Sequence, residues 1–232
     1  MKKMTKRLKA VGGLSDKSKT YSLKEAIAIL KKMPKLKFDE TVEVSAKLNV
    51  DPKQSQSASI RGTIALPHGT GKKVKVAVFC KGEEERNARA AGADFVGSDE
   101  LIAKVQGGWV DFDIAIATPE MMKDMAKLGK VLGPRGLMPS PKSGTVTLDT
   151  AKTIKDVRAG KIEFKMDKQA GIHALLGKLS FSESALQENA TSLIDAIMGS
   201  HAGGIKGQHV KNIYISTTMG PGIKLDLAEF RK

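Results

Sequence analysis

The strand-like stretches of this sequence are of two kinds, and the change from one kind to the other and back most constrains the fold. Residues 39–50 and 58–67 alternate in polarity, with Val42, Val44 and Ala46 of the first stretch on one face. Successive side chains of a strand point to opposite faces, so these strands bury one face and leave the other free for solvent or a ligand. A sheet with one open face is therefore predicted here.

The middle of the chain carries the second kind of strand. Short, mostly continuous apolar stretches lie at residues 73–80, 94–97 and 112–118. Helical segments follow them, starting near Glu83, Ser98 and Thr118. Apolar strands that alternate with helices are typical of a parallel sheet covered on both faces.

Alternation returns after residue 160, where Ile162, Phe164 and Met166 face one way, and a helix over 182–198 and a final strand over 212–218 follow. The two early strands cannot hide their apolar face alone, so these later strands should complete their sheet.

We therefore expect an α/β protein of two domains. Residues 1–68 plus 160–232 form a split α+β domain, interrupted by an inserted α/β domain of residues 69–159. Glycine-containing joints, HGTG and RAGK, would allow the two domains to hinge. Two serial domains in fixed contact remain the alternative.

Local signals define the first helix. Ser22 and Glu25 are spaced as a capping box, the apolar residues after them recur at helical spacing, and Pro34 stops the helix.

The positive charge is concentrated at the start of the chain. Of a formal net charge of +14, residues 1–37 carry +10, with twelve Lys or Arg against Asp16 and Glu25. Such a field favours nucleic acid or an anionic membrane surface as partner, while a solvated basic helix that aids solubility is the alternative. The sequence has neither an apolar run of ~18 residues nor the apolar centre of a signal peptide, so a cytoplasmic protein with no membrane partner is expected.

Motifs for catalysis, cofactors and metals are missing from the sequence. No G-x-G-x-x-G occurs, and HGTGKK fails as a phosphate-binding loop because Leu66 and Lys73 stand where a glycine and a Ser or Thr are needed. The four histidines lack metal-ligand spacing, and the single cysteine, Cys80, ends an apolar strand as a buried core residue would. We expect no enzyme, no cofactor and no metal; a nucleotide-dependent enzyme built on the inserted domain is the alternative.

A glycine- and proline-rich loop, residues 128–147, presents Lys130, Arg135 and Lys142. It cannot continue a helix or strand for long, and the sequence leaves open whether it binds a ligand or only connects two elements.

Six segments taken together resemble the bacterial L-one family of large-subunit ribosomal proteins. They are KFDETVEV, RGTIALPHGTGK, AGADFVG, GKVLGPRGLMPSPKSGTV, AGKIEF and STTMGPGIK, in family order over nearly the whole chain. The resemblance implies that the split domain binds RNA and that the inserted domain is Rossmann-like without a nucleotide site. It implies a monomer within the ribosome that binds the stalk junction of the large-subunit rRNA, helps release deacylated tRNA from the exit site, and represses translation of its own operon mRNA.

The resemblance also implies RNA-contacting positions, which fall in three segments. Those near the first strand are Lys37, Phe38, Thr41 and Lys47. Those near the last strand are Asn212, Ser216, Thr217, Thr218, Met219 and Gly220. The segment after the second joint adds Lys161, Glu163, Lys165, Lys168 and His173.

The residue types at these positions suit RNA recognised by shape. Ser216 and Thr218 lie on the same side of a strand, and their hydroxyls match the 2′-hydroxyls and phosphates of a shallow minor groove. With two Tyr and one Trp in the chain, an aromatic platform for unpaired bases is not expected. The segment 198–212 and the tail LAEFRK depart from the family pattern, which bears on loop geometry rather than on the strands.

Overall fold

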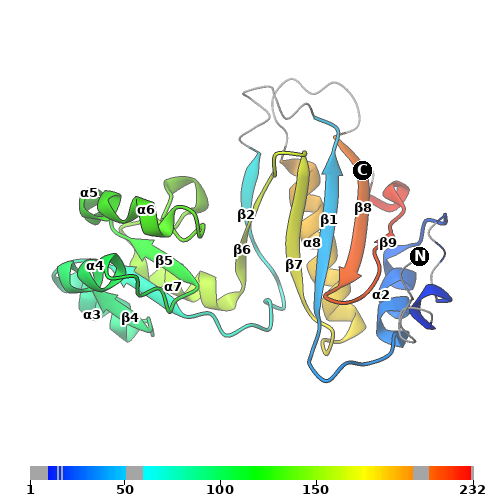
Figure 1. Ribbon diagram of the computed structural model, residues 1–232, viewed down its shortest axis with the longest axis horizontal. Helices are drawn as coiled ribbons and strands as arrows, with labels where there is room; N and C mark the ends of the chain where they lie inside the picture. The colour runs from blue at the N-terminus through cyan, green and yellow to red at the C-terminus, as the bar shows by residue number, and fades with distance from the viewer. Residues whose placement is uncertain (1–9, 15, 17, 51–59, 201–208, 231–232) are drawn as a thin grey trace. The chain divides into compact units, whose positions relative to one another are not determined.

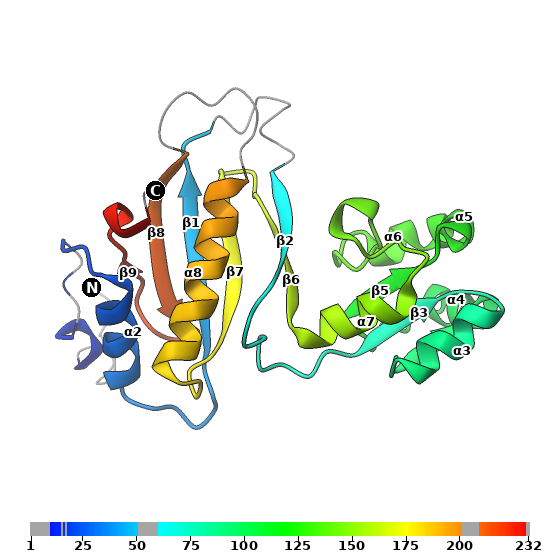
Figure 2. The same ribbon diagram turned by 180° about the vertical axis from the view of Figure 1, so that it is seen from behind.

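The computed structural model describes residues 10–14, 16, 18–50, 60–200 and 209–230 (Figures 1 and 2). It divides into two compact units, residues 1–71 with 162–232, called the split unit, and residues 72–161, called the inserted unit. The predicted fold class, α/β with one α+β domain split by an inserted α/β domain, is confirmed. The first nine residues of the basic arm and residues 201–208 lie outside the described residues.

A four-stranded antiparallel sheet forms the centre of the split unit. Its order is β7-β1-β8-β9. The strands are β1 Thr41–Leu48, β7 Gly171–Lys178, β8 Val210–Thr217 and β9 Ile223–Lys224. The first strand of the chain thus lies between two strands that follow the insertion. As predicted, strands from the end of the chain complete the sheet that β1 begins.

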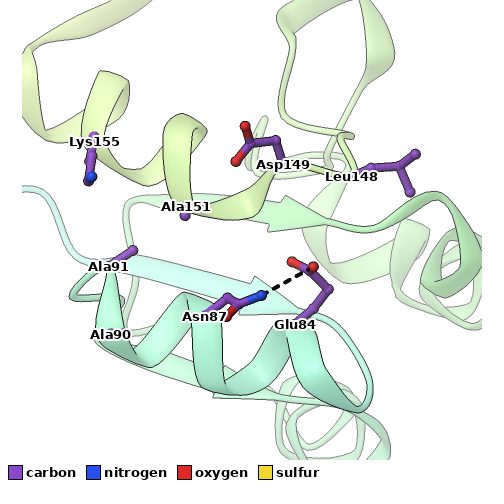
Figure 3. A pocket seen from close by; sticks show the side chains of 8 residues that line it. All are labelled: Glu84, Asn87, Ala90, Ala91, Leu148, Asp149, Ala151 and Lys155. Atoms are coloured by element: carbon purple, nitrogen blue, oxygen red, sulfur yellow. Dashed lines mark hydrogen bonds between the residues drawn. The ribbon is translucent and has the colours of Figure 1, made fainter.

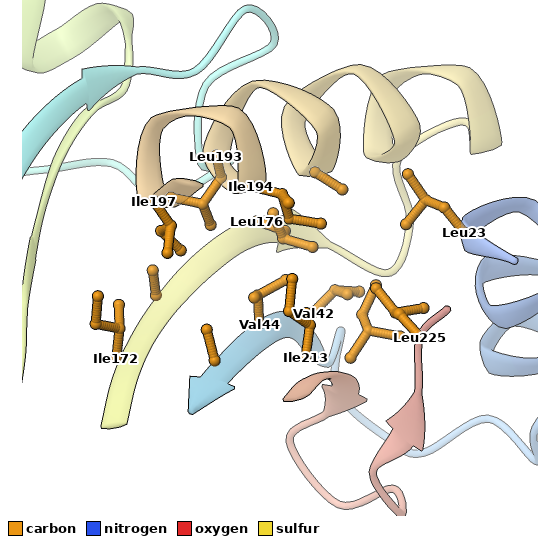
Figure 4. Packing of buried hydrophobic residues seen from close by; sticks show 14 of the residues in the cluster. Leu23, Val42, Val44, Ile172, Leu176, Leu193, Ile194, Ile197, Ile213 and Leu225 are labelled. Atoms are coloured by element: carbon orange, nitrogen blue, oxygen red, sulfur yellow. The ribbon is translucent and has the colours of Figure 1, made fainter. Parts of the chain in front are cut away.

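Two helices, α2 (Leu23–Lys32) and α8 (Glu183–Gly199), cover one face of this sheet (Figure 2). Their apolar residues meet the inward-facing strand residues, as Leu193 and Ile194 meet Val42 and Val44 in Figure 4. The predicted capping box is confirmed, because the Ser22 side chain accepts the Glu25 N–H and the Glu25 carboxylate accepts the Ser22 N–H.

The second early strand, β2 (Arg61–Ala65), joins a different sheet. It pairs with β6 (Lys161–Lys165) in a separate two-stranded ribbon, not with β1. A Cβ at Gly62 would lie 2.6 Å from the Phe164 ring, so glycine lets the two strands pack closely. Alternation predicted a half-buried strand but could not identify its partner.

The inserted unit holds a parallel sheet of order β4-β3-β5, and its strands are β3 Val76–Phe79, β4 Phe95–Gly97 and β5 Ile114–Ala117. Alternate residues of β3 enter two separate apolar clusters, so both faces are covered, as predicted. Cys80 is buried, also as predicted.

Helices of very different length surround this sheet. The longer ones are α3 Glu83–Ala90, α4 Asp99–Gln106 and α7 Thr150–Ala159. The helix expected from Thr118 is confirmed at its start, with Thr118 as N-cap and Pro119 in the first turn. It consists of short 3₁₀ and α segments in succession: Pro119–Met121, α5 Met122–Met125, Ala126–Leu128 and α6 Gly129–Leu132. A separate 3₁₀ turn, Pro141–Ser143, follows further on. Glycine and proline at 133, 134 and 136 prevent a longer helix after Leu132. Among the described residues, no helix has the length and apolarity needed to cross a membrane.

Candidate nucleic-acid interface

The face of the four-stranded sheet opposite the helices carries polar side chains in register. Glu43 lies between Leu175 and Ser216 on the neighbouring strands, Ser45 between His173 and Tyr214, and Lys47 between Gly171 and Asn212. With Thr41, the exposed and half-buried side chains of these rows make up what we call the open face. Its members are Thr41, Glu43, Ser45, Lys47, His173, Leu175, Asn212, Tyr214 and Ser216.

Hydrogen bonds order one end of the open face. Ser45 Oγ lies 3.0 Å from His173 Nδ1, and the Lys47 ammonium donates to the Gln169 carbonyl. The Asp167 carboxylate accepts the N–H groups of Gly171 at 2.6 Å and Gln169 at 2.7 Å. Carboxylates and cations therefore lie close together on this surface.

The pKa of Asp167 lies below its ordinary value. The main cause is the hydrogen bond from the Gly171 N–H, and the Gln169 N–H adds to it. The charges of His173 and Lys47 act in the same direction. Asp167 is thus an anion at neutral pH, and this end of the face carries both signs of charge.

At the other end of the face, the start of β1 is joined to the end of β8. The Thr41 N–H donates to Thr218 Oγ1 at 3.0 Å, and the Thr218 N–H donates to the Thr41 carbonyl at 3.0 Å. Phe38 precedes the start of β1 and Met219 follows the end of β8, with exposed fractions of 53% and 59%. Large apolar side chains this exposed are available to contact a partner.

Thr217 points the other way. It is buried, and its hydroxyl donates to Glu40 Oε1 at 3.2 Å. Of the two neighbouring threonines, the structure presents Thr218 on the surface and keeps Thr217 inside.

The remaining predicted residues divide between the open face and the β2–β6 ribbon. Lys37 is exposed before β1, and Gly220 closes the turn after β8. Lys161, Glu163 and Lys165 lie on β6, in the other sheet. Lys168 is exposed in the turn between β6 and β7. The predicted set therefore lies on the open face and in the segments that adjoin its strands, apart from the three residues of β6 and the buried Thr217.

Three residues of this region were missed in the sequence, although the alternation contained their signal. Ser45 shares its side of β1 with Thr41 and Lys47, and Tyr214 shares its side of β8 with Ser216. Glu40 has the inward parity of Val42, which indicates a buried carboxylate. Counting every second residue would have found all three.

A groove in the inserted unit is the other candidate site (Figure 3). It measures about 540 Å³ and lies between α3 and α7. Its lining residues are Glu84, Asn87, Ala90, Ala91, Leu148, Asp149, Ala151 and Lys155.

Carboxylates occupy the ends of the two helices where a phosphate would bind. Glu84 lies in the first turn of α3, and Asp149 caps α7 by accepting the Lys152 N–H at 3.0 Å. Phosphate binding at a helix start requires free N–H groups and positive potential, and these carboxylates work against both. The groove does not favour a nucleotide.

The described residues of the inserted unit also offer neither a reactive thiolate nor a metal-binding cluster. Burial raises the pKa of the Cys80 thiol to about 11, with the Glu85 and Glu84 carboxylates adding to the effect, so the thiol stays protonated at neutral pH. Within the described ranges, no three His, Cys, Asp or Glu side chains are grouped to hold a metal ion.

Comparison with known proteins covers nearly the whole chain. The sequence model of the ribosomal protein L1p/L10e family matches residues 30–221. The chain is 52% identical over 229 residues to the large ribosomal subunit protein uL1 of Protochlamydia amoebophila, covering 99% of this chain and 97% of that protein. It is 53% identical to uL1 of Chlamydia abortus, covering 99% and 98%, and 51% identical to uL1 of Kosmotoga olearia, covering 97% of each chain.

Proposed function

The chain belongs to the ribosomal protein L1p/L10e family, and on this premise we propose that it is a structural protein of the large ribosomal subunit that binds ribosomal RNA through the open face. Its membership confirms the resemblance drawn from the six sequence segments. A member of this family is a structural protein and not an enzyme, and a protein of the bacterial large subunit works in the cytoplasm.

The single observation that carries the assignment to the open face is the set of hydrogen-bonding side chains in register across three strands. Ser45 of β1, His173 of β7, and Asn212 and Ser216 of β8 offer donors and acceptors, and Lys47 of β1 adds one cation. The RNA minor groove is wide and shallow and displays 2′-hydroxyls and base edges, so a polar sheet face can contact it.

The carboxylates of this surface support RNA over DNA. Glu43 lies on β1 between Leu175 and Ser216, and Asp167 is ionised beside His173. A carboxylate repels phosphate but accepts a hydrogen bond from a 2′-hydroxyl, which DNA lacks. We therefore expect recognition of a folded RNA shape, with Phe38 and Met219 contacting sugars or bases at the edge.

We propose further that the RNA is the stalk junction of the large-subunit rRNA, that the protein helps release deacylated tRNA from the exit site, and that it represses its own operon by binding a similar mRNA structure. The proposed RNA-binding domain comprises residues 1–68 plus 160–232, and residues 69–159 form the Rossmann-like insertion. Support for these points is the family resemblance and the open face within the split unit.

The test measures affinity for a transcribed stalk-junction fragment and for an unrelated RNA duplex of equal length, across a salt series. We expect a preference of ~10³ or more that persists at high salt, because purely electrostatic binding weakens steeply with salt. Thr218→Ala and Met219→Ala should each cost roughly 1–3 kcal/mol of binding free energy, the order of a lost contact.

A matched control is Leu148→Ala, which truncates an exposed apolar side chain in the inserted unit and should leave affinity unchanged. Equal, salt-sensitive binding of both RNAs would show that only the basic arm is acting. Full affinity in both the Thr218 and the Met219 variant would remove the assignment to this face.

A further inference from the structure

Glu40 is a carboxylate buried at the boundary between the core and the open face. Its exposed fraction is 2%, and it lies immediately before β1. A carboxylate leaves water at a high cost in free energy unless hydrogen bonds replace its hydration. The hydrogen bonds that compensate the burial of Glu40, at the edge of the proposed binding face, therefore need to be identified.

The carboxylate of Glu40 holds the turn that follows β8. Oε1 accepts the Met219 N–H at 3.0 Å and the Thr217 hydroxyl at 3.2 Å. The carbonyl of the same residue accepts the Leu179 N–H at 2.8 Å, which ties it to the end of β7. Glu40 thus joins three strand ends, two of them more than 130 residues away in sequence.

The residues of the turn that follows β8 also pack closely against one another. The Gly220 N–H donates to the Thr217 carbonyl at 3.0 Å. A Cβ at Gly220 would lie 2.4 Å from Thr217 Oγ1 and 3.3 Å from Met33 Sδ. The Thr217 hydroxyl thus lies between Gly220 and the Glu40 carboxylate, with no room for a side chain at position 220.

We propose that Glu40 is a positioning residue for RNA binding: its buried carboxylate fixes the 217–220 turn so that Thr218 and Met219 are held in their binding geometry before RNA arrives. The inference rests on the proposed function, since it concerns the same site. Glu40 itself does not touch RNA, because it is buried. Affinity is gained because the turn need not be ordered on binding.

The test compares Glu40→Gln with Glu40→Met. Glutamine keeps a carbonyl oxygen for the Met219 N–H and the Thr217 hydroxyl, so affinity for the stalk-junction fragment should stay within about threefold. Methionine keeps the volume but leaves both donors unpaired, and affinity should fall at least about tenfold. In hydrogen exchange, the peptide covering residues 213–222 should lose protection in Glu40→Met while the centre of β1 keeps it.

A positioning role is separated from plain destabilisation by a double-mutant cycle. In a Met219→Ala background, Glu40→Met should cost less affinity than it does in the wild type, because one of the two contacts it positions is already gone. Asn189→Ala is the matched control. Asn189 is fully buried on the helix side of the sheet and hydrogen bonds to His68, Gly69 and Leu176, so its loss should lower stability with no change in RNA affinity.

Outcomes for the two proposals differ. A wild-type protein without preference for the stalk fragment would defeat the proposed function, while the exchange of residues 213–222 would still report on Glu40. If the wild type shows that preference, two results would overturn the positioning role. One is full RNA affinity of Glu40→Met, and the other is a loss of affinity from Glu40→Met that is as large in the Met219→Ala background as in the wild type. Should Glu40→Met fail to fold, Thr217→Val, which removes only the hydroxyl, takes its place in the same cycle with the same criteria.

Discussion

The two units of this protein solve the burial of a sheet in different ways. In the split unit, helices cover one face of an antiparallel sheet, and the other face presents side chains from three strands in register. In the inserted unit, a parallel sheet is covered on both faces, so its functional groups can lie only in loops and at strand ends. The difference indicates that an uncovered sheet face, more than the fold class, determines which unit is suited to bind a large ligand with a shallow surface, such as a folded RNA.

Spectroscopic reporters happen to separate the two units. The single tryptophan, Trp109, packs between Phe95 and Phe112 in the inserted unit, and the two tyrosines, Tyr21 and Tyr214, belong to the split unit. Tryptophan fluorescence therefore follows the unfolding of the inserted unit, and under the proposed function the RNA affinity reports on the binding face of the split unit.

Cavities in the two cores should give the largest effects. Phe79→Ala and Leu176→Ala remove fully buried side chains from the inserted and the split unit, at a cost of about 3–5 and 2–5 kcal/mol in the stability of the unit concerned. The first should lower the midpoint of the tryptophan transition in urea without changing RNA affinity. The second should lower the midpoint of the split-unit transition, followed by far-ultraviolet circular dichroism, while leaving the tryptophan transition in place. A loss of RNA affinity in Phe79→Ala would show that the units are energetically coupled.

Removing the helix cap of α2 should have a smaller effect, confined to the split unit. Ser22→Ala loses the acceptor for the Glu25 N–H, which costs about 1 kcal/mol. Thermal unfolding followed by far-ultraviolet circular dichroism should show the shift, and Ser22→Asp, which restores an acceptor, should recover most of it. An unchanged unfolding temperature in Ser22→Ala would mean that α2 is held by its packing alone.

A single cation on the open face should act mainly through salt dependence. Lys47→Gln should reduce the slope of log affinity against log salt by about 1 if Lys47 contacts one phosphate. Lys155→Gln removes an equal charge beside the groove of the inserted unit and should leave the slope unchanged. Equal slopes in the two variants would show that Lys47 does not contact a phosphate of the bound RNA.

The smallest expected effect is on stability at acid pH, and each unit has one carboxylate whose substitution tests it. Folding lowers the pKa of Asp167 in the split unit and of Asp113 in the inserted unit, the latter chiefly through a hydrogen bond from Lys72. A carboxyl with a lowered pKa stabilises the fold above its unfolded pKa of about 3.9, and this contribution is lost as the pH falls below that value. Asp167→Asn and Asp113→Asn should each flatten the dependence of stability on pH between about 4 and 2. Urea midpoints at pH 7 and pH 3 measure this, and curves parallel to the wild type would contradict it.

Much of the fold and of the candidate site was predictable because it depends on local patterns. Alternation identified the half-buried strands and placed Ser216 and Thr218 on one side, and the Ser22–Glu25 spacing identified a cap. The partner of β2 was not predictable, because alternation specifies which face is buried and not which strand lies beside it. The helix start at Thr118 and Pro119 was predictable, but the division of that helix into short 3₁₀ and α segments was not, because proline at a helix start does not predict how the helix continues.

The sequence by itself determined the two kinds of strand, the clustering of charge, the local caps and the family, since each depends on residues a few positions apart or on motifs read in order. Only the tertiary structure decided that β2 pairs with β6 rather than with β1, and that the Glu40 carboxylate meets a backbone N–H 179 residues away. The physical reason is that hydrogen bonds between distant strands are selected by packing of the whole core, which no local pattern records.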